Sequence, residues 1–284
     1  MSSTIVHLVA DSTCDLAAAE AADHGLTVVP LKVIIGEEVY ADGIEIDSAT
    51  LYSRMRSSPV VPRTSQPTPA EFEAVFSRLG ADGAPIVCTT ISAEMSGTHG
   101  SAVQARAALP DLDIRVIDTR TVGPGHLQVV EALFAARDAG ATPAELEGVA
   151  AAVRSTQRLL ATVPSLEYLR RGGRIGGARA LLGSVLNIKP VLEVRDGTVE
   201  PLDRVRTFPR AIERILEELA AAVAGWNGRA AVMVSHADEQ AAAADVVRRA
   251  SAIAGVMPRL IDLGPVIGCH AGPGAIALAF HRPL

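Results

Sequence analysis

A hydroxyl-rich segment of this chain has residues suited to binding an anion or acting on one. Ser96 lies in the segment Ser92–Thr98, which leads into an expected helix. Helix N-termini carry unpaired N–H groups and attract anions, so a serine hydroxyl beside one can donate to a carboxylate or phosphate. A serine at this place can equally cap the helix and bind no ligand. The segment therefore leaves a ligand site and a helix cap as alternatives.

A second candidate hydroxyl stands in the turn Thr64-Ser65-Gln66-Pro67, ahead of an expected helix. Thr68 and Glu71 have the spacing of a capping box, and Pro69 falls at the first helical position. Capping explains Thr68 and Pro69, but it does not explain Thr64. We therefore take Thr64 as a candidate ligand-binding residue.

His270 lies in the glycine-rich segment Gly268–Gly274, which is expected to be a turn between two apolar segments. Glycines let a ligand approach a histidine closely, but a histidine packed in a turn fits the pattern equally well. Ser96 and His270 would also suit a serine hydrolase with Asp11 or Asp118 as the orienting carboxylate. No Gly-x-Ser-x-Gly elbow supports the hydrolase. A redox enzyme that uses the glycine turns is a third interpretation.

The elements that must position these residues alternate in the first half of the chain. Apolar strands are expected at Ile5–Ala10, Leu26–Ile35, Pro85–Ile91 and Ile114–Asp118, and helices at Leu16–Asp23, Pro69–Leu79, Ser101–Leu109, Gly125–Ala139 and Pro143–Arg154. This order is typical of a parallel sheet with helices on both faces. Ligands of such sheets bind beyond the carboxyl ends of the strands. The segments expected there are Asp11–Thr13, Ile91–Thr98 and Asp118-Thr119.

The second half of the chain predicts a mixed sheet backed by helices. Strands are expected at Leu159–Pro164, Pro190–Arg195, Thr198–Val205, Ala230–His236, Arg259–Leu263 and Ala275–His281, and helices at Phe208–Val223 and Glu239–Ala252. Asp196-Gly197 favours a tight hairpin between two of these strands. The sequence thus predicts an α/β protein of two domains: an α/β/α domain with a parallel sheet over 1–157, and a two-layer domain with a mixed sheet over 158–284.

Composition narrows the classes of function. The 284 residues are 49% hydrophobic and 3% aromatic with a net charge of −6, which excludes disorder and disfavours nucleic-acid binding. No apolar run reaches the about 18 residues of a membrane span, and no signal peptide is recognisable. Three scattered cysteines suit neither a disulfide framework nor a zinc site. A cytoplasmic protein without a metal or cofactor is expected.

Six motifs occur in a fixed order over about residues 5–283. They are ADSTCDL at Ala10–Leu16, TSQP at Thr64–Pro67, SGT at Ser96–Thr98, VID at Val116–Asp118, LRRGGRI at Leu169–Ile175 and HAGPG at His270–Gly274. In this order they resemble the DegV family, which includes the fatty-acid-binding FakB proteins. The resemblance implies the same two-domain fold and a buried apolar tunnel for a long-chain fatty acid such as palmitate or oleate. It also implies a lipid-binding carrier, with a place in lipid transport and fatty acid metabolism, and no catalysis of its own.

The resemblance also assigns residues. Thr64, Ser96 and His270 match the positions that hold the fatty acid carboxylate. In the FakB branch a partner kinase phosphorylates the bound fatty acid to an acyl phosphate, and Arg174 and Arg206 match the arginines implicated in docking that kinase. No nucleic acid, metal or stable membrane insertion is implied.

Two departures and one cluster qualify this picture. Thr119–Gly123 replaces a turn that is usually rich in serine, and Ala271 stands where threonine or serine is common. Arginines are frequent in one region, which suits either a solvated face or a docking surface; they are Arg170, Arg171, Arg174, Arg179, Arg204, Arg206 and Arg210. Candidates for the tunnel wall, which core packing explains equally well, are Leu181, Leu182, Val185 and Leu186.

Overall fold

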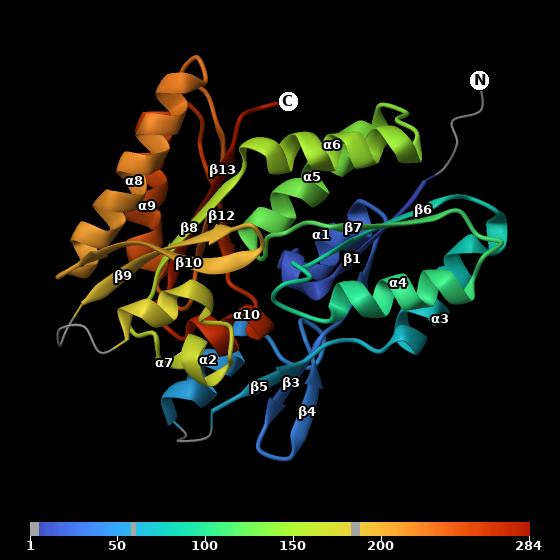
Figure 1. The fold of residues 1–284 in the computed structure, drawn as a ribbon, viewed down its shortest axis with the longest axis horizontal. Helices are drawn as coiled ribbons and strands as arrows, with labels where there is room; N and C mark the ends of the chain where they lie inside the picture. Colours follow the sequence, from blue (N-terminus) through green and yellow to red (C-terminus); the bar gives the residue numbers. More distant parts are fainter. Residues whose placement is uncertain (1–5, 58–60, 183–187) are drawn as a thin grey trace.

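The protein is built around two large β-sheets with helices between and outside them (Figure 1). The computed structural model describes residues 6–57, 61–182 and 188–284. Within these ranges the strands form a four-stranded sheet, a six-stranded sheet and a small three-stranded sheet.

The four-stranded sheet is parallel throughout, as the sequence predicts. It consists of β1 (His7–Asp11), β2 (Leu26–Val29), β6 (Ile86–Thr90) and β7 (Ile114–Asp118), in the order β2-β1-β6-β7. Its two faces are covered by α3 (Pro69–Leu79) and α4 (Thr98–Ala108) on one side, and by α1 (Ala18–Asp23), α5 (Pro124–Asp138) and α6 (Pro143–Thr156) on the other. Alternate residues of each strand pack toward opposite faces, because successive side chains of a strand point to opposite sides.

The six-stranded sheet is mixed, again as predicted. Its strands are β8 (Arg158–Thr162), β9 (Lys189–Arg195), β10 (Thr198–Val205), β11 (Ala231–His236), β12 (Arg259–Asp262) and β13 (Ile276–His281), in the order β10-β9-β8-β13-β11-β12. Only β11 and β12 run parallel to each other. The expected hairpin joins β9 to β10, and both Asp196 and Gly197 have the positive φ of a primed turn. The outer face is covered by α8 (Phe208–Gly225) and α9 (Gln240–Ala254).

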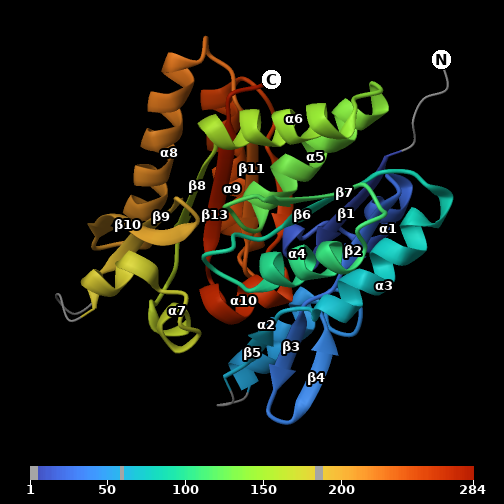
Figure 2. The same cartoon turned by 45° about the vertical axis from the view of Figure 1, so that its right-hand side comes forward.

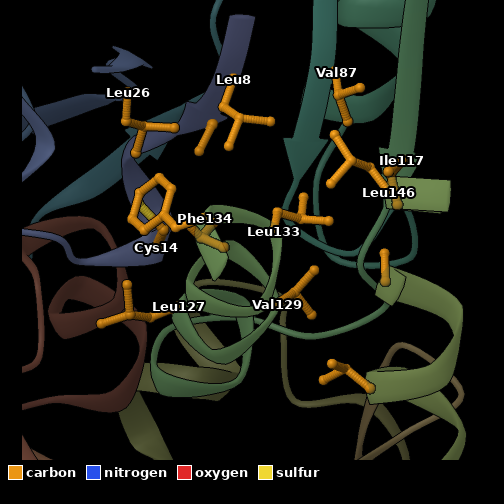
Figure 3. Packing of buried hydrophobic residues seen from close by; sticks show 14 of the residues in the cluster. Leu8, Cys14, Leu26, Val87, Ile117, Leu127, Val129, Leu133, Phe134 and Leu146 are labelled. Atoms are coloured by element: carbon orange, nitrogen blue, oxygen red, sulfur yellow. The ribbon is translucent and has the colours of Figure 1, made fainter. Parts of the chain in front are cut away.

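Helix α5 lies between the two large sheets (Figure 2). Its apolar side chains pack on the parallel sheet and also on Leu159, Met233 and Ala277 of the mixed sheet. Figure 3 shows part of this core, with Leu133 of α5 close to the strands of the parallel sheet. A helix packed from both sides must be apolar over most of its surface, which explains why α5 is buried along most of its length.

Ion pairs also connect the mixed sheet to the helices on the parallel sheet. Arg259 of β12 contacts Glu20 of α1 and Glu131 of α5, each at 2.5 Å between nitrogen and oxygen. The division near residue 157 lies between α6 and β8, and it stays a prediction.

The three-stranded sheet corrects the expectation of one long strand over Leu26–Ile35. Strand β2 ends at Val29, and the chain then enters an antiparallel sheet of β3 (Lys32–Ile35), β4 (Glu38–Ala41) and β5 (Arg63–Ser65). The break falls at Pro30, which has no N–H for a sheet ladder. The next residue, Leu31, donates its N–H to Ser12 Oγ at 3.0 Å instead. Helix α2 (Ser48–Ser57), between β4 and β5, was also not expected.

A short helix corrects the expected turn at Gly268–Gly274. Residues Pro265–Ala271 form α10, which has Pro265 at its start and ends at Gly272 with φ of +77°. His270 therefore lies in the last turn of a helix and not in a loop. The remaining short elements are α7 (Glu167–Arg171) and the 3₁₀ turns η1 (Ser12–Cys14), η2 (Gly80–Asp82) and η3 (Gly176–Leu181).

Candidate functional site

Thr64 and His270 are brought into direct contact by the fold. Thr64 is the central residue of β5, where it pairs with Val33 of β3, and α10 packs against this small sheet. The distance from Thr64 Oγ1 to His270 Nε2 is 2.8 Å, although the two residues are 206 positions apart in the sequence. Two of the three predicted carboxylate-binding residues thus form one hydrogen-bonded pair.

The second ring nitrogen of His270 has no hydrogen-bond partner among the residues that the structure describes. Nδ1 is buried and makes no hydrogen bond within the described ranges. A Cβ on Gly172, at the end of α7, would lie 2.0 Å from this nitrogen, so only glycine leaves room for the ring as it is placed. Burial lowers the pKa of His270 to about 4, and the nearby Arg174 guanidinium adds to the effect. The imidazole is therefore neutral at pH 7.

Ser96 lies in the loop between β6 and α4. Its Oγ is 2.9 Å from Thr98 Oγ1, and the N-cap of α4 is Gly97, which offers no side chain. Ser92 donates its hydroxyl to the carbonyl of Gly197 at 2.8 Å and so holds the loop against the β9–β10 hairpin. Neither serine is therefore the N-cap residue itself. Ser96 Oγ nevertheless accepts the N–H of Thr98, the first residue of α4, at 3.3 Å, so its hydroxyl also serves the start of the helix. The capping box of Thr68 and Glu71 is confirmed.

Arg174 joins the Ser96 loop to the segment after α7. Its Nε donates to the carbonyl of Met95 at 3.0 Å, and its Nη1 donates to the carbonyl of Gly172 at 2.7 Å. The residue is exposed. Arg174 thus stands beside Ser96 and His270, at the surface of the molecule.

Arg206 lies elsewhere. It follows β10 and is exposed. Val199, at the other end of β10, lies near η3. Arg206 is seven residues further along the chain, and at about 3.3 Å per residue of strand this places it roughly 23 Å from Val199. The structure therefore does not bring Arg206 to the group formed by Thr64, Ser96, Arg174 and His270.

A cavity connects these four residues with the core. Its interior encloses about 940 Å³ between atoms, a volume that includes the part open to solvent. Six lining residues are not apolar side chains: Thr64, Ser96, Gly123, Arg174, Glu193 and His270. The rest of the lining is apolar and consists of Leu31, Ile91, Met95, Val122, Pro124, Leu159, Ala161, Val163, Leu169, Leu192, Val194, Val199, Leu263, Val266, Ile267, Ala271, Ala275 and Ala277.

Most of this wall was missed in the sequence. Leu159 and Ala161 on β8 are two positions apart, as are Leu192 and Val194 on β9, so each pair lies on one face of its strand. That spacing is visible in the sequence, but it does not tell which face meets a cavity.

The residues that the sequence suggested for the tunnel wall were not found in the lining of the cavity. Leu181 packs on the neighbouring core and Leu182 is exposed, and neither lines the cavity. Val185 and Leu186 lie outside the described residues.

The geometry does not support a serine hydrolase. A catalytic histidine needs an orienting carboxylate, yet none of the described carboxylates contacts Nδ1 of His270. Asp11 accepts hydrogen bonds from Thr13 and from the N–H of Ile91, and Asp118 accepts from backbone N–H groups. Both carboxylates therefore serve the loops at the ends of the parallel strands.

Neither a metal site nor a membrane span was found in the described ranges. No group of three or more His, Cys, Asp or Glu side chains is arranged to hold a metal ion there. The helices of the same ranges are all too short or too polar to cross a membrane.

Comparisons with known proteins agree with the resemblance seen in the sequence. The DegV domain-containing protein SCO2569 of Streptomyces coelicolor is 38% identical over 280 residues, which cover 96% of this chain and 97% of the relative. A DegV family protein from Thermus thermophilus, described for its fatty acid binding, has a TM-score of 0.90 at 31% identity, with 98% of this chain and 99% of that one covered.

A stearic acid-binding protein from Eubacterium ventriosum has a TM-score of 0.91 at 27% identity, with 98% of each chain covered. The model of the DegV family, described as an uncharacterised protein, matches residues 5–282. With this match over nearly its whole length, the chain belongs to the DegV family.

Proposed function

We propose that this protein binds one long-chain fatty acid, such as palmitate or oleate, in the cavity described above. The observation that carries the proposal is an apolar cavity whose hydroxyl and imidazole groups gather in one place. A carboxylate beside Thr64, Ser96 and His270 leaves the rest of the lining to an acyl chain. The relatives from Thermus thermophilus and Eubacterium ventriosum, described as binding fatty acid and stearic acid, support the same ligand class.

The contact between Thr64 and His270 suggests how the protons are arranged. A threonine hydroxyl has one proton, and a carboxylate can only accept hydrogen bonds. If Thr64 donates to the carboxylate, His270 must donate from Nε2 to Thr64 Oγ1, and the neutral imidazole then leaves Nδ1 without a proton. The carboxylate would also accept from Ser96. This arrangement needs no charged histidine, which agrees with the lowered pKa of His270.

The acyl chain would supply most of the binding free energy. Burial of each methylene contributes about 0.8 kcal/mol, so a palmitoyl chain contributes on the order of 10 kcal/mol before the costs of ordering. Hydrogen bonds to a charged group contribute about 1.5–3 kcal/mol each. Thr64, Ser96 and His270 would therefore mainly fix the position of the carboxylate.

In this proposal the protein is a carrier that presents the lipid and does not itself transform it. A fatty-acid kinase would phosphorylate the bound carboxylate, and Arg174 would dock the kinase at the surface beside the carboxylate. Arg206, at the far end of β10, would contribute a second and more distant contact. Three buried free thiols, Cys14, Cys88 and Cys269, suit a reducing cytoplasm.

Organic extraction of the purified protein followed by mass spectrometry tests the proposal. We expect close to one fatty acid per chain from protein made in a bacterial host, because an empty apolar cavity exposes much apolar surface to water. As a blank, protein from which the lipid has already been removed is heated and extracted in the same way. Lipid-free protein that also fails to bind added palmitate or oleate would rule the function out.

A further inference from the structure

A second cavity lies beside the turn Thr119–Gly123, which follows β7. It contains about 800 Å³ of space between atoms, part of it open to solvent. Its lining is mostly polar and consists of Thr119, Arg120, Thr121, Ala151, Arg154, Ser155, Gln157, Leu159, Val194 and Asp196. Leu159 and Val194 line the fatty-acid cavity as well, so the two cavities share a wall.

Two arginines from different elements are fixed at this cavity. Arg154 of α6 donates from Nη1 to the carbonyl of Asp118 at 3.0 Å. Arg120 donates from Nη2 to the carbonyl of Asp196 at 2.9 Å, across the gap to the β9–β10 hairpin. Each guanidinium has five N–H donors, so one such bond orients the group and leaves the others available.

The backbone at Arg120 is held in an unusual conformation. Its φ is +55°, in the left-handed region that residues other than glycine adopt only at a cost. The N–H of Arg120 donates to Asp118 Oδ1 at 2.8 Å and thereby stabilises the turn. Such conformations persist where the surroundings impose them, and they are frequent at ligand sites.

Thr121 lies at the edge of this cavity, but its hydroxyl is enclosed by protein. The residue is 4% exposed, and its hydroxyl makes no hydrogen bond to any described residue. The other hydroxyls of the cavity do have partners: Thr119 donates to the carbonyl of Thr90 at 2.7 Å, and Ser155 donates to the carbonyl of Ala152 at 2.7 Å. A Cβ added to Gly125, at the start of α5, would clash with Thr121 Oγ1, so this hydroxyl is enclosed against α5 and is no ligand group of the cavity.

The charges of the lining indicate the sign of a ligand of this cavity. Arg120 and Arg154 contribute two positive charges, against one carboxylate on Asp196, which is 3.8 Å from Arg120. The planar donor fork of arginine matches the oxygens of a phosphate or carboxylate. We propose that this cavity binds a phosphate group through Arg120 and Arg154, on the other side of the wall from the fatty acid.

Titration with inorganic phosphate at low ionic strength, followed by calorimetry on the full chain, tests the site. Arg154→Gln and Arg120→Gly each remove one guanidinium, and glycine suits the φ of +55° at position 120. Each variant should weaken phosphate binding about tenfold or more. Arg248→Gln is the matched control, because Arg248 is a 75% exposed arginine on α9, and it should bind as the wild type does.

A second arm identifies the source of the phosphate. The protein is sedimented with phosphatidic acid vesicles and, for comparison, with phosphatidylcholine vesicles. Cosedimentation with the phosphatidic acid vesicles that is lost in Arg154→Gln would assign the site to a lipid head group. Binding of inorganic phosphate without cosedimentation would assign it to a soluble phosphate. The proposal is overturned if the wild type binds neither probe, or if Arg120→Gly and Arg154→Gln bind as the wild type does. Fatty acid content is measured on the same samples, so failure of this site remains distinct from failure of the carrier function.

Discussion

At the scale of single residues, the proposed function depends on a few donors around one carboxylate. Thr64→Ala and Ser96→Ala each remove one hydrogen bond to a charged group, worth about 1.5–3 kcal/mol. We expect each to weaken fatty acid binding by about one to two orders of magnitude. Displacement of a fluorescent fatty acid analogue from delipidated protein measures the change.

Thr68→Ala is the matched control for Thr64→Ala. Thr68 caps α3 and accepts from the N–H of Glu71, four residues along the chain from Thr64. Its loss should reduce the free energy of unfolding by about 1 kcal/mol and leave lipid affinity unchanged. If Thr64→Ala behaves in the same way as Thr68→Ala, the hydroxyl of Thr64 has a structural role only.

Sequence reasoning at this scale reached the residue types but not their contacts. Thr64 stood out because the capping box of Thr68 and Glu71 leaves its hydroxyl unexplained. Its contact with His270 depends on the packing of β5 against α10, and nothing local to either residue specifies that packing. The role of Gly172 beside the imidazole was invisible for the same reason.

At the scale of elements, α7 and α10 must meet closely to position His270. Gly172 has φ of −73°, which alanine adopts without strain, so the main obstacle to a side chain there is the imidazole, with the Tyr168 carbonyl oxygen a lesser one at 3.2 Å from an added Cβ. Gly172→Ala should displace the ring and weaken fatty acid binding about tenfold, the loss of roughly one hydrogen bond. The same fluorescence displacement measures it.

Gly100→Ala provides the comparison for this substitution. Gly100 lies within α4, where an added Cβ meets no atom within 4 Å, so alanine should stabilise the helix by roughly 0.5–1 kcal/mol. Its lipid affinity should equal that of the wild type. Unchanged affinity in Gly172→Ala would show that the position of the His270 ring does not matter for the ligand.

Helices and strands that have local sequence signals were predictable, and those that depend on packing against distant segments were not. Helix α3 begins and ends where Pro69, its capping box and its apolar spacing predict, and the β9–β10 hairpin forms at Asp196-Gly197. The three-stranded sheet was missed because β3 continues an apolar run from β2, and only Pro30 and Leu31 separate the two strands. Glycines within Gly268–Gly274 suggested a turn, whereas packing on the small sheet stabilises α10 as a helix.

At the scale of the whole molecule, the two sheets were predictable and their assembly was not. Periodicity predicts each sheet and the helices that cover it. It does not predict that α5 packs on both sheets at once, nor that β8, β9 and α10 together enclose a cavity. Those features depend on which apolar faces meet, and the sequence carries that information only as a sum over many contacts.

The position of Arg174 at the surface of the assembled molecule leads to a prediction about the proposed kinase partner. Arg174 is exposed beside the cavity and is fixed by the carbonyls of Met95 and Gly172. An exposed arginine so placed can attract a nucleotide-bearing protein and stabilise phosphate charge during transfer. Arg174→Ala should therefore retain fatty acid at the wild-type ratio but lose acyl phosphate formation with the cognate kinase and ATP.

The rival role for Arg174 is a direct bond to the fatty acid carboxylate, since it lines the cavity together with Ser96 and His270. That role predicts that the purified Arg174→Ala variant contains no bound fatty acid. Arg171→Ala is the matched control, because Arg171 is exposed on α7 and pairs with Glu167. Added salt should slow the kinase reaction of the wild type, because exposed charges are screened over about 10 Å at 0.1 M. If Arg174→Ala forms acyl phosphate at the normal rate, or if it contains no bound fatty acid, docking of the kinase is not the role of Arg174.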